Sequence, residues 1–117
     1  MKKLIKIPIW EKKLLIVTYP TNVLKAAKDS KMARELISQV REGPPEKSWQ
    51  GCLYFDDKRG QSILWFPNNK PRTDTIIHET NHLVKFLMEF IGAEKEFEAH
   101  AYTQEWLYNT IKKILRG

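Results

Sequence analysis

Two histidines four residues apart, with a glutamate directly after the first, are the side chains of this chain best suited to chemistry. His78, Glu79 and His82 form the pattern H-E-x-x-H. On an α-helix, positions i and i+4 lie on the same face, so both imidazole rings can bind one tetrahedral Zn²⁺ ion. Glu79 lies roughly 100° further round the helix, where its carboxylate can accept a proton from a water molecule that the metal activates. The pattern therefore predicts metal-assisted hydrolysis with Glu79 as the general base.

The alternative is that the two histidines are ordinary polar side chains of a helix. A continuous apolar stripe with a helical period surrounds them in the sequence and consists of Ile76, Ile77, Thr80, Leu83, Val84, Leu87 and Ile91. On a helical wheel this stripe lies opposite His78 and His82, so the pair does not belong to the main core face. We therefore expect a metal site.

A catalytic zinc ion needs a third protein ligand and an open coordination position. Cys52 is the only cysteine, which excludes a site built from several thiolates. Gly92 is suited to end the first helix, and a second helix is expected from residues 93–95 to about residue 115. So short a link makes the two helices an antiparallel pair. The main packing face of the second helix is expected to contain Phe97, Ala101, Gln104, Tyr108, Ile111 and Leu115.

The third ligand is sought near the start of this second helix. Glu98 lies on a strip that flanks the packing face and is the favoured ligand, whereas Glu94 and Glu96 are better explained as acids favoured by the helix dipole. His100 remains an alternative, because imidazole is a common zinc ligand. Tyr102, one turn beyond Glu98, can donate its phenol to a developing oxyanion or pack as an amphipathic side chain between the helices.

Residues 75–107, TIIHETNHLVKFLMEFIGAEKEFEAHAYTQEWL, resemble the zincin metallopeptidases of the gluzincin type, in which a glutamate from a following helix completes H-E-x-x-H. More narrowly, they are similar to small metallopeptidases encoded by bacteriophages and prophages, whose active helix is followed by Glu-x-x-Ala-Tyr. The resemblance implies Zn²⁺ bound by His78, His82 and Glu98. It also implies Glu79 as general base in peptide-bond hydrolysis, with a peptide or protein as the substrate.

The order of the expected elements is β-β-α-β-β-α-α, an α+β fold with a small, mainly antiparallel sheet and the two C-terminal helices packed against it. The resemblance makes this a minimal zincin-like domain that comprises residues 1–117. Before the H-E-x-x-H helix, we expect two hairpins and one helix, with the strands at 4–9, 14–19, 50–56 and 61–66 and the helix at 22–41. Pro8 places the first strand at a sheet edge, and strand 61–66 is the candidate for a second free edge that pairs with an extended substrate.

The chain has 117 residues, 42% of them hydrophobic, and a formal net charge of +6. No stretch is long and apolar enough to span a bilayer, so no membrane partner is expected. A single cysteine cannot form an internal disulfide, which is consistent with the cytoplasm, or the host cytoplasm if the protein is phage-encoded. The basic residues match no recognisable DNA-binding or RNA-binding module, so nucleic acid is not the favoured partner. The oligomeric state is left open.

Two other functions remain compatible with the sequence. The metal could only staple two helices together in a phage structural, regulatory or interaction protein without catalytic activity. A basic accessory protein that binds nucleic acid is the other alternative. An intact Glu79 favours catalysis, because a purely structural zinc site needs no base.

Overall fold

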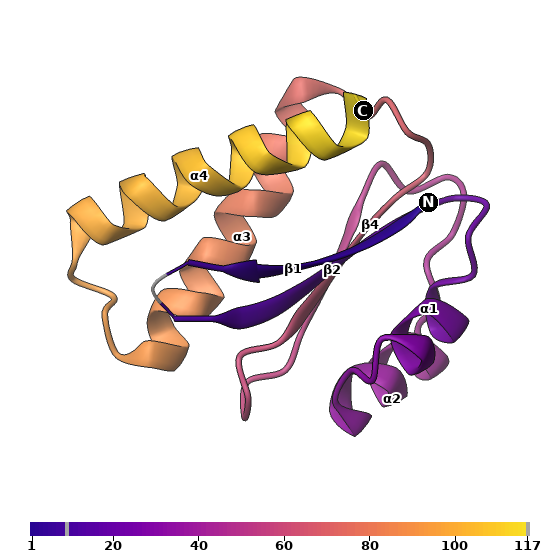
Figure 1. Ribbon diagram of the computed structural model, residues 1–117, viewed down its shortest axis with the longest axis horizontal. Helices are drawn as coiled ribbons and strands as arrows, with labels where there is room; N and C mark the ends of the chain where they lie inside the picture. The colour runs from indigo at the N-terminus through magenta and orange to yellow at the C-terminus, as the bar shows by residue number, and fades with distance from the viewer. Residues whose placement is uncertain (9, 117) are drawn as a thin grey trace.

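Within residues 1–8 and 10–116, the chain folds into an α+β structure with four helices and a mixed four-stranded sheet (Figure 1). The computed structural model describes residues 1–8 and 10–116, so Ile9, which the sequence placed in the first strand, lies outside the described residues. The elements are β1 (Lys2–Ile7), β2 (Lys12–Thr18), α1 (Val23–Asp29), α2 (Arg34–Glu42), β3 (Cys52–Phe55), β4 (Ser62–Phe66), α3 (Thr73–Ile91) and α4 (Phe97–Arg116).

The strands lie in the order β1-β2-β4-β3. The two predicted hairpins are confirmed, since β1 pairs with β2 and β3 pairs with β4, both antiparallel, while β2 and β4 pair in parallel. The prediction that β1 is an edge strand is also confirmed. The prediction that β4 forms a free edge is wrong, because β4 is central and buried along its whole length, whereas β3 is the second edge. The uninterrupted apolar run of β4 is typical of a strand that is covered on both faces.

Helices cover both faces of the sheet, with α3 and α4 on one side and α1 and α2 on the other (Figure 1). Successive side chains of β2 point to opposite faces of the sheet and so belong to two separate core clusters. Leu14 and Ile16 belong to the cluster beneath α3 and α4, whereas Leu15 and Val17 belong to the cluster beneath α1 and α2. No helix in the described part of the chain is both long and apolar enough to cross a membrane.

The single helix predicted over residues 22–41 is wrong, because the chain breaks there into α1 and α2. Ala27 and Leu36 are both completely buried, yet nine residues of continuous helix would turn them to opposite sides, roughly 180° apart. Lys31, at φ 54°, lies in the left-handed region between the two helices. The break therefore allows both residues to pack on the same face of the sheet.

The pair α3 and α4 keeps part of its predicted form. Gly92 ends α3 in the left-handed conformation, at φ 73° and ψ 25°, as predicted. Helix α3 begins at Thr73, and the residue before it, Arg72, forms no side-chain cap. Helix α4 begins at Phe97 instead of at residues 93–95. The predicted packing face of α4 is only partly correct: Thr103, Leu107 and Ile111 are buried, while Phe97 is 79% exposed. The apolar residues of α4 occupy more than one side of the helix, so its period alone does not fix which side faces the core.

Candidate metal and catalytic site

His78 and His82 lie together on the exposed side of α3, as the sequence predicted. Their Nε2 atoms are 3.2 Å apart, and the ring planes cross at 81°. Two imidazole nitrogens bound to one tetrahedral zinc ion at about 2.0–2.1 Å stand about 3.3 Å apart. The same separation also fits an N–H···N hydrogen bond between two neutral rings. The pair thus supplies two donors at the spacing that a metal ion requires, without any rearrangement of α3.

Glu79 is partly buried between α3 and the start of β3. A Cβ atom on Gly51 would lie 3.1 Å from Glu79 Cγ and 3.4 Å from the methyl group of Thr75. Gly51 therefore lets the backbone that enters β3 approach the carboxylate side chain more closely than any other residue would allow. The general base predicted from the sequence faces the edge strand of the sheet.

This packing changes the acidity of the neighbouring groups. Burial raises the pKa of Glu79 above its ordinary value, although positive charge on His78 and His82 acts in the opposite direction. Burial likewise raises the pKa of the Cys52 thiol, which accordingly favours the uncharged form beside Glu79. A carboxylate with a raised pKa accepts a proton more readily near neutral pH.

Helix α4 packs on the side of α3 that faces away from the histidines. Gln104 Nε2 donates a hydrogen bond to Thr80 Oγ1 at 2.5 Å. Thr80 lies roughly 200° round α3 from His78, so this contact fixes α4 behind the pair. Glu98 precedes Gln104 by six residues, about 9 Å along the helix axis, and is exposed to solvent.

Within residues 1–8 and 10–116, no group of three or more histidine, cysteine, aspartate or glutamate side chains could hold a metal ion. His100 is partly buried, and Tyr102 is 61% exposed. Neither shares a hydrogen bond or a ring contact with the histidine pair in the described part of the chain. The ligand role of Glu98, its alternative His100 and the oxyanion role of Tyr102 stay predictions.

Some neighbours of the pair were not found from the sequence. A depression of about 420 Å³ beside His78 is lined by Gln50, Asp74, Thr75 and His78 itself. Asp74 lies four residues before His78, so it continues the i, i+4 row of His78 and His82 by one more turn. This spacing could have identified Asp74 from the sequence. Gln50 and Cys52 carry no such signal, because only the folding of β3 onto α3 brings them to the site.

The donor set fits a zinc site in part, because the pair supplies two imidazole nitrogens and the described part of the chain places no third donor beside them. Comparison with protein-family models, with curated proteins and with solved structures gives no significant match. The assignment of the site therefore depends on the distances and burial of its own residues.

Proposed function

We propose that the chain is a zinc-dependent peptidase with a minimal zincin-like architecture. In this proposal His78 and His82 bind the metal, and Glu79 is the general base. The observation that carries the proposal is the 3.2 Å separation of the two Nε2 atoms, with a partly buried carboxylate one residue from the first histidine. Glu98 is the proposed third ligand. Because Glu98 is exposed and forms no metal-holding group with the pair within residues 1–8 and 10–116, metal binding through Glu98 requires a rearrangement of the first turns of α4.

A zinc ion, when bound, polarises a carbonyl group and lowers the pKa of water from about 15.7 to about 7. The chain supplies the proton transfer and the positioning. Glu79 can accept a proton from the attacking water and return it to the leaving amine, and burial of its side chain raises its pKa above the ordinary value. Gly51 keeps that carboxylate against β3, so the base lies beside an edge strand that can hold an extended peptide backbone.

The substitution Glu79→Gln tests the proposal. It retains the shape of the side chain and removes its basicity, so zinc affinity should stay within about twofold while peptide cleavage falls by about 10²- to 10⁴-fold. Cleavage of a mixed peptide library by zinc-loaded protein is the measurement, with Glu105→Gln on the exposed side of α4 as the control. Undiminished cleavage by Glu79→Gln would exclude Glu79 as the base.

The same experiment separates the peptidase from the other two functions. A zinc-stapled protein without activity predicts zinc binding and no cleavage by the native chain. A nucleic-acid-binding protein predicts a DNA affinity that falls steeply with salt and does not depend on zinc. The partly buried carboxylate of Glu79 beside the pair favours the peptidase over the staple, because a purely structural zinc site needs no base.

A further inference from the structure

A groove of about 760 Å³ lies between the edge strand β3 and the C-terminal half of α3. Four of its lining side chains are apolar, and the complete lining is Gln39, Leu53, Phe55, Asp57, Phe86, Glu89 and Phe90. The ring centroid of Phe55 lies 5.7 Å from that of Phe86 and 6.4 Å from that of Phe90. The groove therefore offers an aromatic surface of the kind that binds a large apolar side chain.

The groove continues directly from the histidine pair. His78, His82, Phe86 and Phe90 follow one another at intervals of four residues, so their rings form one row along α3. The rings of His82 and Phe86 are stacked, with centroids 6.4 Å apart and planes at 21°. A ligand that lies in the groove would consequently extend past the proposed metal ligands.

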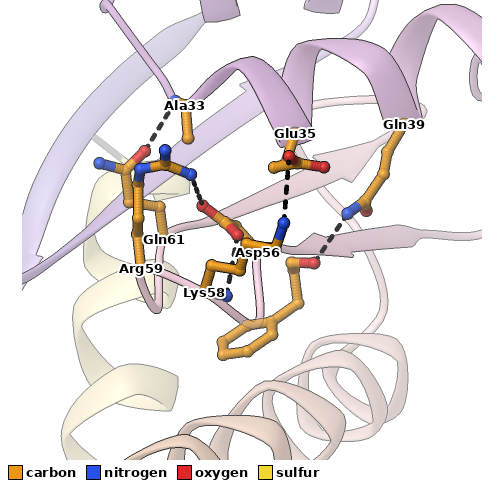
Figure 2. Close-up of polar contacts among 8 residues, drawn as sticks. Ala33, Glu35, Gln39, Asp56, Lys58, Arg59 and Gln61 are labelled. Atoms are coloured by element: carbon orange, nitrogen blue, oxygen red, sulfur yellow. Dashed lines mark hydrogen bonds and ion pairs between the residues drawn. The ribbon is translucent and has the colours of Figure 1, made fainter.

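Strand β3 presents backbone hydrogen-bonding groups along this groove. The Asp56 N–H donates to the carbonyl of Gln61 at 2.9 Å, so the alternation of an antiparallel ladder turns the backbone groups of Leu53 and Phe55 towards the open edge. Gln39 Nε2 donates to the Phe55 carbonyl at 2.9 Å, where it takes the place of a neighbouring strand (Figure 2). The N–H and C=O of Leu53 are thus positioned to pair with an added strand.

The hairpin that carries this edge is tied to α2. Ala33 N–H donates to Gln61 Oε1 at 2.8 Å, and Lys58 pairs with Glu35 at 3.8 Å (Figure 2). Asp56, which is almost fully buried, accepts a hydrogen bond from the Lys58 N–H. These contacts fix the hairpin, so the groove does not have to be ordered by its ligand.

The charges of the groove are opposite to those of the whole protein. Asp57 and Glu89 are its only charged lining residues, and neither forms an ion pair within residues 1–8 and 10–116. Lys12 lies 5.1 Å from the Phe90 ring centroid but does not line the groove. Two acids without a partner, on a protein with a net charge of +6, favour a basic residue in the ligand.

We propose that the groove binds the substrate through a large apolar residue with a lysine or arginine close to it. The proposal rests on the peptidase function and names the substrate class of that site. A peptide that pairs antiparallel with β3 through Leu53 and continues past the Gln39 contact places its residue at the level of Phe55 on the same face of the sheet, above Phe86 and Phe90. Its residue two positions earlier then lies beside Asp57 and Glu89.

The position of the apolar residue relative to the cleaved bond follows from the geometry. The midpoint of Phe86 and Phe90 lies eight residues beyond that of His78 and His82, about 12 Å along α3. An extended peptide covers this distance in three to four residues. The apolar residue therefore lies three or four positions before the cleaved bond, on its N-terminal side.

The test measures binding without turnover, in the Glu79→Gln protein, by fluorescence anisotropy of a labelled, end-blocked peptide that carries Lys two positions before Phe. Phe86→Ala should weaken binding by about tenfold, the effect of losing one buried apolar contact. Its matched control is Phe97→Ala, which removes a ring that is 79% exposed and outside the groove.

A substitution of a charged residue provides a second binding measurement, and it changes an exposed side chain that does not belong to the core. Glu89→Lys should reduce the preference for the Lys peptide over a Glu peptide by about threefold or more, while Glu105→Lys on α4 should leave that preference intact. Equal binding by Phe86→Ala and the parent protein would overturn the proposal, and so would an unchanged charge preference in Glu89→Lys. A native dimer that Phe86→Ala dissociates in sedimentation analysis would assign the groove to a second copy of the chain.

This design separates the inference from the peptidase proposal. Selective peptide binding by a native protein that cleaves nothing would reject the activity and retain the groove as a peptide site. Cleavage that is insensitive to Phe86→Ala and Glu89→Lys would reject the groove and retain the activity.

Discussion

The two helices that should form the metal site differ in how completely they do so. On α3, His78 and His82 stand at the separation of two zinc ligands, and Glu79 packs against Gly51. On α4, Glu98 is exposed and, within residues 1–8 and 10–116, forms no group with the pair that could hold a metal ion. The features of α3 follow from helical spacing inside one element, whereas the position of Glu98 depends on where a second element packs. For the proposed zinc site, the pair on α3 needs no rearrangement of its helix, whereas binding through Glu98 would require the first turns of α4 to move.

Of the substitutions that test this difference between α3 and α4, His82→Ala is expected to change zinc affinity most. Loss of one of two preformed ligands should lower zinc affinity by at least about 100-fold, since even the partners that only orient metal ligands contribute 10- to 100-fold. Competition against a zinc-binding dye measures the affinity. Asn81→Ala, at the exposed neighbouring position, is the matched control and should stay within about twofold. Equal affinities of the two variants would contradict the metal role of the pair.

The next effect concerns α4. Glu98→Ala should lower zinc affinity more than His100→Ala does, by about tenfold, and zinc should increase the hydrogen-exchange protection of the first turns of α4 in the native protein but not in Glu98→Ala. The reverse order of the two variants would transfer the third-ligand role to His100. Equal, unchanged affinities in both would show that α4 supplies no ligand.

A smaller effect is expected at Gly51. The added Cβ of Gly51→Ala meets Glu79 Cγ at 3.1 Å, so the carboxylate must shift, and kcat should fall by about tenfold with unchanged zinc affinity. Gly43→Ala is the control, because its Cβ meets nothing closer than the Gln39 carbonyl at 3.8 Å. If the two variants retain the same kcat, contact with β3 does not position the base.

Features that depend on neighbouring residues could be predicted from the sequence. The histidine pair follows from i, i+4 spacing, and the end of α3 follows from Gly92, because only the local backbone decides both. The break between α1 and α2 could also have been predicted, since Ala27 and Leu36 would fall on opposite sides of one continuous helix. Sequence distance alone reveals that conflict.

Features that depend on strand order or helix rotation could not be predicted in this way. The apolar pattern of β4 marks it as buried but does not say that β3 lies outside it. Nothing near Gly51 or Cys52 in the sequence points to Glu79, and the rotation of α4 that exposes Phe97 is set by packing against α3 and the sheet. These arrangements are decided by contacts between distant parts of the chain.

The most direct test of the central claim is the zinc K-edge absorption spectrum of protein loaded with one equivalent of zinc. We expect imidazole nitrogens at about 2.0–2.1 Å from the metal, with multiple scattering from two histidine rings that disappears in the double variant His78→Ala, His82→Ala. An identical zinc environment in the native and double-variant proteins would contradict this expectation.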